Sequence, residues 1–332
     1  MGVLSSTQAL LLLLFTTIIW GSWYQCIKRL NGWPVAAFML WMYTFSVGIV
    51  WGIILVIKPF FIAEPLLEII QRQPGDCIFA LCCGMFFCAG VQINMIVIKN
   101  VGLILSTSIS ATCSVLVGTF TSCLFGGIRE GQSVVKIAIA SVILIAAAII
   151  CQLASKMRDM DNGKNAKDES YKQEMKHRMK NTLFLLFGAL FLNPAYSIAQ
   201  SVTVQTDLNP DGIPALLCVG LLSIGSFLGT WVISGIWLTR KKQWRTCFSW
   251  KNRKGIFMSL FAAFCHYGGN VGYCVSAPVL SFAIAWPMGT SFNLWQYVYG
   301  ILYGEFNKTT WKTKITLFTG IICFIIGVLI LS

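Results

Sequence analysis

Long apolar runs recur along this chain, and they limit what it can fold into. Each is close to the roughly 20 residues that an α-helix needs to cross the hydrocarbon core of a bilayer. Charged residues make up only 11% of the 332 residues, whereas soluble domains contain about a quarter. A soluble fold could not cover its surface with so few polar groups, but lipid solvates apolar side chains. The sequence therefore predicts an all-α integral membrane protein.

Ten runs are long enough to cross a membrane. They cover residues 8–27, 35–57, 77–98, 101–125, 134–154, 182–202, 212–238, 255–274, 276–303 and 315–331. The break between the third and fourth runs is short, at Lys99 and Asn100, and so is the break between the eighth and ninth, near Pro278. The first run has no Lys/Arg-rich segment before it and many runs after it, which favours a first span over a cleaved signal peptide.

The charged residues indicate an orientation. The net charge is +13, and the Lys and Arg residues lie in the segments between runs, as in membrane proteins rather than nucleic-acid-binding proteins. If the N-terminus is outside, all of them fall on the inner side except Lys58, Arg72, Arg129 and Lys136. Positive residues favour the cytoplasmic side. We therefore expect both termini outside, the central loop in the cytoplasm, and the plasma membrane as the location.

The two sides of the central loop resemble each other. The offset that carries Gly126 to Gly304 also carries Lys136 to Lys314. The same offset pairs Phe79 with Phe257, Phe86 with Phe264, Gly90 with Gly268, and the amides Gln92 and Asn270. We expect two five-helix repeats, at residues 1–154 and 182–332, joined by a charged linker at 155–181. Because five is odd, the second repeat is inverted, and inverted repeats build carriers with a solute site near the midplane.

Three segments of the second half carry a family resemblance. They are His-Tyr-Gly-Gly-Asn at 266–270, Ala-Ile-Ala-Trp-Pro at 283–287, and Tyr-Gly-Ile-Leu-Tyr-Gly-Glu-Phe at 299–306. Together with five plus five spans, they resemble the drug/metabolite transporter superfamily. They are similar to its ureide permease branch and to the related bacterial glucose/ribose and rhamnose uptake proteins. The resemblance is good over residues 255–332 and vaguer over the first half. Ureide permeases carry a Walker-A-like stretch in the central loop, and this chain does not.

The resemblance implies that spans three, four, eight and nine line a solute path, with spans one and six contributing. Polar and aromatic side chains on these spans are candidates for binding, because an unpaired polar group is costly in lipid. The candidates are Trp20, Gln92, Asn94, Tyr196, His266, Tyr267, Asn270, Trp286, Asn293 and Gln296. Each also has a structural interpretation, as a helix–helix hydrogen bond or an interfacial aromatic. For Trp23 the interfacial interpretation is favoured.

Small residues indicate where helices pack closely. Gly225 with Gly229, and Gly300 with Gly304, form Gly-x-x-x-Gly motifs. The hydroxyls of span four serve either the path or close packing; they are Ser106, Thr107, Ser108, Ser110, Thr112 and Ser114.

The candidates differ in the chemistry they offer. The amides Gln92 and Asn270 supply donors and an acceptor, which suits a sugar hydroxyl or a ureide carbonyl, and we expect alanine at either position to abolish uptake. His266 is the only His within a span and can carry a proton near neutral pH. Glu305 closes span nine, and no Asp or Glu lies in the middle of a span. This favours facilitated transport, or proton coupling through His266 or Glu305, and disfavours a cationic solute.

The leading hypothesis is a carrier that moves a small neutral polar metabolite, a sugar, ureide or nucleobase, by alternating access. The sequence has no His-Glu-x-x-His motif, nucleotide-binding loop or paired Cys-x-x-Cys motifs, so we expect no enzyme activity, cofactor or metal site. The expected partners are the solute and the bilayer, with a proton only in the case of coupled transport, and no nucleic acid. One alternative is a nucleotide-sugar or drug carrier of the same superfamily. Another is a non-transporting membrane sensor or scaffold. The sequence leaves the oligomeric state open.

Overall fold

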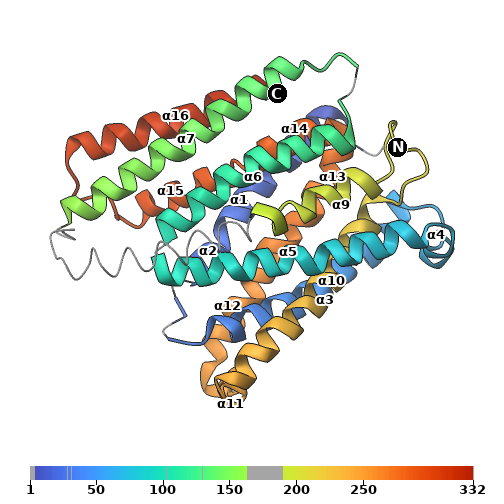
Figure 1. The fold of residues 1–332 in the computed structure, drawn as a ribbon, viewed down its shortest axis with the longest axis horizontal. Coiled ribbons are helices and arrows are strands. Elements are labelled where there is room, and N and C mark those ends of the chain that lie inside the picture. The colour runs from blue at the N-terminus through green and yellow to red at the C-terminus, as the bar shows by residue number, and fades with distance from the viewer. Residues whose placement is uncertain are drawn as a thin grey trace.

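The computed structural model describes most of the chain as a bundle of α-helices (Figure 1). The described residues are 4–27, 29–30, 32–101, 103–128, 130–162 and 190–331, with side chains described except at 96–101 and 103–114. Within these ranges there is no strand, and the β-type pairing found there is an isolated bridge between Val204 and Ile213. The described fold is therefore all-α, as the apolar runs predict.

The helices of the first half follow the predicted runs. They are α1 (Ser6–Ser22), α2 (Tyr24–Ile27), α3 (Val35–Phe61), α4 (Leu66–Arg72), α5 (Pro74–Val101), α6 (Leu103–Gly126) and α7 (Val134–Asp161). The predicted break at Lys99 and Asn100 lies slightly later, because both residues belong to α5. α7 continues to Asp161, so the predicted linker at 155–181 begins as helix. From residue 163 onward that linker lies outside the described residues.

The second half is more interrupted. Its elements are α9 (Ala195–Thr203), α10 (Ala215–Arg240), α11 (Trp244–Cys247), η1 (Trp250–Asn252), α12 (Arg253–Ala263), η2 (Phe264–Gly268), α13 (Gly269–Leu280), α14 (Phe282–Gly289), α15 (Phe292–Leu302) and α16 (Trp311–Leu331). The predicted sixth span, 182–202, is described only from residue 190. The break expected near Pro278 lies at Ser281, whose φ of 78° separates α13 from α14. The Ser281 hydroxyl donates to Oε1 of Gln132 at 2.8 Å and holds this turn.

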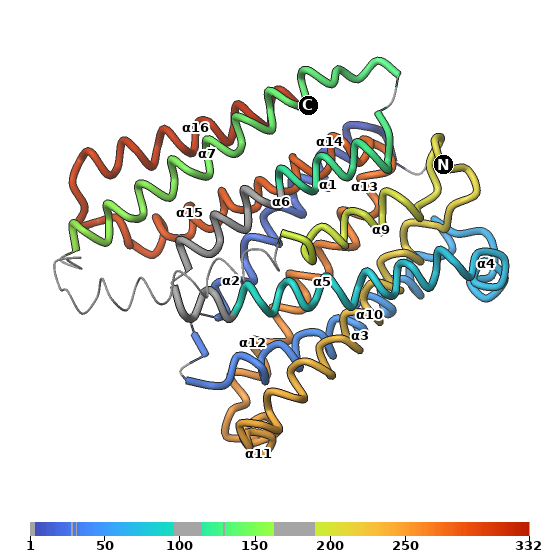
Figure 2. The backbone as a smooth tube through the Cα atoms, viewed as in Figure 1, coloured from blue at the N-terminus to red at the C-terminus, as the bar shows by residue number. Residues whose placement is uncertain are grey.

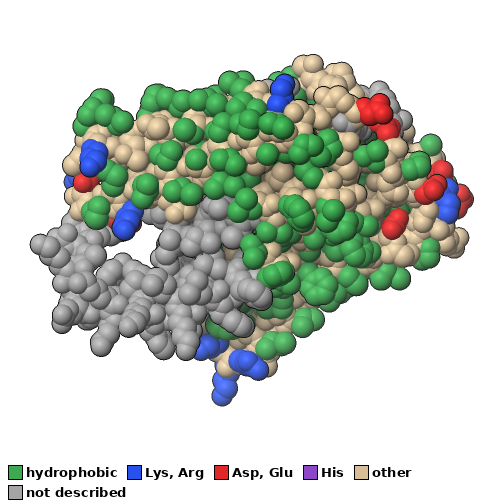
Figure 3. Space-filling model, turned by 45° about the horizontal axis from the view of Figure 1, so that its top comes forward, with side chains coloured by type: hydrophobic (Ala, Val, Ile, Leu, Met, Phe, Trp, Pro, Cys, Tyr) green, Lys and Arg blue, Asp and Glu red, His purple; other side chains and the backbone are tan. Residues whose placement is uncertain are grey.

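Six helices in the described part of the chain are long and apolar enough to cross a membrane. They are Ser6–Ile27, Val35–Phe61, Pro74–Met95, Val134–Asp161, Ala215–Arg240 and Trp311–Leu331. A shorter apolar helix covers Val115–Gly126. Hydrophobic side chains form a broad band over the face shown in Figure 3. These features are those of a multi-pass integral membrane protein.

The helices pack in defined pairs. α7 lies along α16 at the upper edge of Figures 1 and 2, and α3 packs against both α10 and α12. α10 also packs on α5, α9 on α5 and α6, and α1 on α13 and α15. Gly229 allows α10 to approach α5, because a Cβ there would lie 3.2 Å from the Cα of Met85. Close packing at Gly225 and Gly229 is thus confirmed. Gly304 instead lies in the turn after α15, with a φ of 72°.

Candidate functional site

A π-helical turn, η2, interrupts the long helix formed by α12 and α13. In such a turn the backbone hydrogen bonds reach five residues back, and π-turns inside α-helices often occur at functional sites. His266 and Tyr267 lie within η2, and their exposed fractions are 5% and 0%. The turn therefore sets two candidate side chains in the interior, about midway along the helix that runs from Arg253 to Leu280.

The imidazole of His266 is enclosed by aromatic rings from four segments. The ring centroid of Trp23 lies 5.0 Å away and that of Tyr267 lies 5.3 Å away. Tyr43 of α3 approaches to 5.8 Å, and Phe87 of α5 stacks at 5.9 Å. Nδ1 of His266 is buried without a hydrogen-bond partner among the described residues. Trp23 is only 2% exposed, so the interfacial interpretation of its sequence position is wrong.

Trp20 of α1 joins this turn to the start of α13. Its indole N–H donates to Oδ1 of Asn270 at 2.9 Å and to the carbonyl oxygen of His266 at 3.0 Å. Gly269 permits the contact, because a Cβ there would lie 2.6 Å from the Trp20 ring. The amide Nδ2 of Asn270 is buried, and the described residues offer it no partner. Asn270 is therefore oriented by Trp20 while keeping both of its donor hydrogens.

Two tyrosines and Trp286 complete the enclosure. The Tyr196 hydroxyl donates to the backbone oxygen of Asn270 at 3.4 Å. The Tyr196 ring lies 6.0 Å from Tyr273 and 6.1 Å from Trp286, measured between ring centroids. The Tyr273 ring lies 5.4 Å from that of Trp20. Like the Tyr43 hydroxyl, the Tyr273 hydroxyl is buried without a hydrogen-bond partner in the described part of the chain.

These side chains form one connected group, which we call the aromatic cluster. It consists of Trp20, Tyr43, Tyr196, His266, Asn270 and Tyr273. The hydrogen bonds and ring contacts described for its members involve no Asp, Glu, Lys or Arg side chain. The cluster can therefore stack on a flat molecule and exchange hydrogen bonds with neutral polar groups.

Gln92 lies apart from the cluster and serves a different contact. Its Nε2 donates to the Thr230 hydroxyl at 3.3 Å, and its Oε1 accepts from the Ser234 hydroxyl at 3.0 Å. Both partners belong to α10, so the amide joins α5 to α10. The structure therefore does not bring Gln92 and Asn270 together. Asn94, further along α5, is buried at 8% exposure.

The remaining candidates also lie outside the cluster. Nδ2 of Asn293 donates to the backbone oxygen of Thr290 at 2.8 Å, within the same segment. Gln296 is half-buried, with a buried Nε2 that has no partner among the described residues. Glu305, in the turn before α16, forms an ion pair with Arg158. The span-four hydroxyls from Ser106 to Ser114 lie outside the described side chains.

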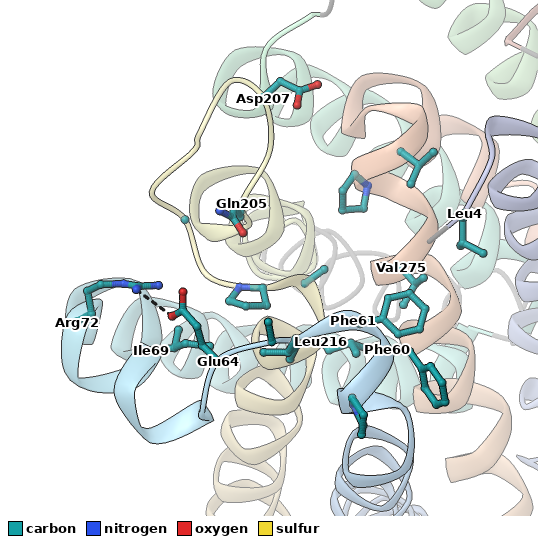
Figure 4. A pocket seen from close by; sticks show the side chains of 18 residues that line it. Leu4, Phe60, Phe61, Glu64, Ile69, Arg72, Gln205, Asp207, Leu216 and Val275 are labelled. Carbon is teal, nitrogen blue, oxygen red and sulfur yellow. Dashed lines mark ion pairs between the residues drawn. The ribbon is translucent and has the colours of Figure 1, made fainter. Parts of the chain in front are cut away.

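A cavity of about 600 Å³ lies away from the aromatic cluster, at the end of the molecule that carries α4 (Figure 4). The end of α3, the loop before α10 and the end of α13 surround it. Among the described residues, no three His, Cys, Asp or Glu side chains are grouped as a metal would require. The cavity and the aromatic cluster are two candidate places for a small organic ligand.

Of the residues predicted from the sequence, Trp20, Tyr196, His266 and Asn270 belong to the aromatic cluster, and Tyr267 and Trp286 contact it. Tyr43 and Tyr273 were not predicted. A tyrosine within an apolar run is a weak indicator, because it is common both in helix packing and at membrane interfaces. A search against protein-family models found no match for this chain, and a search of curated proteins found no significant similarity.

Proposed function

We propose that the protein is a multi-pass carrier that moves a small neutral polar metabolite by alternating access. The solute would be a sugar, a ureide or a nucleobase, bound at the aromatic cluster. One observation carries this proposal: the cluster holds buried polar atoms that have no partner among the described residues. They are Nδ1 of His266, Nδ2 of Asn270 and the hydroxyls of Tyr43 and Tyr273.

Unpartnered polar atoms of this kind are costly. Each buried donor or acceptor without a partner costs about 1–3 kcal/mol, and native interiors contain few of them. In a membrane span, polar groups that face the bundle interior commonly mark a substrate path. A bound solute with several hydroxyls or amide groups would satisfy these atoms, while the rings of Trp20 and Tyr273 would cover its flat faces.

The packing of the helices supports two related halves. Exchanging spans one to five with spans six to ten makes α1 correspond to α9, and α5 to the long helix of α12 and α13. The contact of α1 with α13 then corresponds to that of α9 with α5. Likewise α1 with α15 becomes α9 with α6, and α3 with α12 becomes α10 with α5. The pairs α3 with α10 and α7 with α16 map onto themselves. This pattern is expected of inverted repeats, which build carriers around a site between the halves.

The distribution of charge supports the proposed orientation. Acidic side chains gather at the end that carries α4, and most visible Lys and Arg side chains lie at the opposite end and below (Figure 3). The α4 end would therefore be outside, with both termini, and the basic end would face the cytoplasm. In a plasma membrane this orientation would expose the cavity at the α4 end to the extracellular solution.

Transport would be facilitative or coupled to a proton. His266 is the coupling candidate nearest the proposed solute, because it belongs to the aromatic cluster. Glu305 is the alternative, although it is held by Arg158 in this structure. A pH gradient across vesicles that drives accumulation would identify proton coupling, and equilibration without accumulation would identify facilitation.

The test is uptake by purified protein in liposomes, with labelled glucose, allantoin and uracil supplied separately. We expect saturable uptake of at least one, and its loss in Asn270→Ala protein of normal folded yield. Uptake of labelled UDP-glucose instead would favour a nucleotide-sugar carrier. Thermal stabilisation by a solute without uptake would favour a sensor, and the absence of both would overturn the proposal.

A further inference from the structure

The cavity at the α4 end combines two kinds of surface. Phe61 and Val275 contribute apolar wall, and Gln205 contributes an amide from the loop before α10 (Figure 4). Glu64 and Arg72 form an ion pair of 2.9 Å at this lining, with side chains 49% and 57% exposed. The acid and base of this pair offer hydrogen-bond acceptors and donors to a polar solute, and Asp207 adds a carboxylate to the same lining. A volume of about 600 Å³ is enough for a small metabolite.

The helix α13 leads from this cavity to the aromatic cluster. Val279 and Val275 line the cavity. Val271 follows one turn further along the same helix face and is 6% exposed. Beyond it lies Tyr267 in the π-helical turn, with its ring 5.3 Å from that of His266. Val271 therefore lies between the cavity and Tyr267 on this face of α13, and the cluster residue Tyr273 lies between Val271 and Val275 along the helix.

The helix α10 borders the same route. Leu216, near its start, lines the cavity. Further along α10, the backbone oxygen of Leu222 accepts a hydrogen bond of 3.1 Å from the Tyr267 hydroxyl, which also contacts the Ser226 hydroxyl at 2.6 Å. Two helices, α10 and α13, thus run from the cavity wall to Tyr267, whose ring lies beside that of His266.

At the opposite end of the molecule, polar contacts join neighbouring helices. Arg158 at the end of α7 pairs with Glu305 in the turn between α15 and α16. The guanidinium carbon of Arg158 lies 5.1 Å from the ring centroid of Phe306. The hydroxyls of Ser22 and Tyr299 are hydrogen-bonded at 2.7 Å and join α1 to α15. These contacts hold α1, α7, α15 and the turn before α16 together at the end away from the cavity.

We propose that the cavity is the outer vestibule of the solute path, where a neutral polar solute binds first, and that Arg158 and Glu305 hold the inner end closed in this conformation. This inference rests on the proposed transport function. It adds a second binding position and assigns the open side.

Cysteine accessibility tests the vestibule without knowledge of the solute. Val279→Cys and, as a matched control, Val142→Cys are placed in the full chain; Val142 lies on α7 and is 65% exposed on an apolar surface. Intact cells are treated from outside with a cationic, membrane-impermeant methanethiosulfonate, and modification at each residue is followed by mass spectrometry. We expect residue 279 to react about tenfold faster than residue 142, because the reactive thiolate requires water. Val275→Cys provides a second position.

The outcomes are separable. Equally slow reaction at residues 279 and 142 would overturn the vestibule proposal. Reaction of residue 279 only after detergent extraction would also overturn it, because lipid would then fill the cavity in the membrane. Loss of uptake after modification of residue 279 would support it. If unmodified protein takes up none of the tested solutes, the transport proposal fails. Normal uptake with an unreactive residue 279 would count against the vestibule alone.

The role of Arg158 and Glu305 in closing the inner end is tested by the rate of modification at residue 279. Glu305→Gln removes the charge that holds Arg158, so the inward-open population rises. We expect modification at residue 279 to slow about threefold. Asp159→Asn, which removes an equal charge that pairs with Arg158 on α7 itself, is the matched control and leaves the rate near its original value. An unchanged rate in Glu305→Gln would overturn the assignment of this pair to closure.

Discussion

The sequence offset between the two halves pairs Gln92 with Asn270, yet the surroundings of the two amides differ. Both amides are buried, at 7% and 2% exposure. Gln92 is satisfied by two hydroxyls of α10 and holds two helices together. Asn270 accepts from Trp20 but keeps an unpartnered Nδ2 among the described residues. The same functional group thus serves packing in one half and faces the proposed solute site in the other.

The backbone explains how equivalent amides come to differ. The residues before Asn270 form the π-helical turn η2, from Phe264 to Gly268. Their counterparts from Phe86 to Gly90 lie inside α5, which is α-helical throughout. An extra residue in one turn rotates the C-terminal part of a helix relative to its N-terminal part. The second half can therefore direct Asn270 toward α1, whereas the regular helix of the first half directs Gln92 toward α10.

The largest expected effect belongs to Asn270. Asn270→Ala removes the amide that would hydrogen-bond the solute through at least two bonds. At about 1.5 kcal/mol each, their loss corresponds to a decrease in uptake of about 100-fold. Initial uptake rates in liposomes measure this, with the size-exclusion profile as the check on folding. Near-normal uptake would mean that the unpartnered Nδ2 has no role in binding.

His266→Phe sharpens the comparison by removing the neighbouring polar atom. The phenyl ring preserves contacts with Phe87 and Tyr43 but lacks Nδ1. We expect uptake to fall about tenfold, which corresponds to the loss of one buried hydrogen bond to the solute. If His266 also carries the coupling proton, the dependence of uptake on external pH disappears. A pH profile of initial rates distinguishes the two roles, and unchanged rates at every pH would exclude both.

Trp20→Phe tests whether the orientation of Asn270 matters. Phenylalanine keeps an aromatic ring beside Tyr273 but loses the N–H that donates to Asn270 and to the carbonyl of His266. We expect uptake to fall about fivefold, because Asn270 becomes free to rotate. This effect is smaller than the loss of one full hydrogen bond to the solute. The half-saturating solute concentration should rise. Trp295→Phe, which removes a bond to Thr17 outside the cluster, is the matched control.

The sequence predicted the helices better than it predicted their interruptions. Runs of apolar residues indicate spans directly, because the bilayer sets their length. Pro278 suggested a helix break, but a proline is tolerated in a span when neighbouring groups satisfy the freed backbone. The true break, at Ser281, depends on a hydroxyl contact with Gln132 from a distant loop. Such contacts leave no trace in the local sequence.

The candidate site was predictable in part for the same reason. His266 and Asn270 stand out because polar groups are rare in apolar runs. The π-helical turn that presents them was not predicted, since its contacts, such as the bond from Trp20 to the carbonyl of His266, join segments far apart in the sequence. Trp23 was misjudged because an aromatic residue near a span end is typical both of the interface and of the core. Only packing against His266 distinguishes the two.

Gln92→Ala has the smallest expected effect on uptake and tests the comparison most directly. The sequence alone predicts loss of uptake, whereas the contacts with Thr230 and Ser234 predict uptake within about twofold of the original and stability lower by about 1 kcal/mol. Replacing all three residues with apolar ones, as Gln92→Leu, Thr230→Val and Ser234→Ala, should restore the melting temperature, because no polar group is then left unpaired. Thermal unfolding in detergent, beside uptake in liposomes, measures both effects. Abolished uptake with unchanged melting would place both amides on the solute path, and the two halves would then be functionally alike.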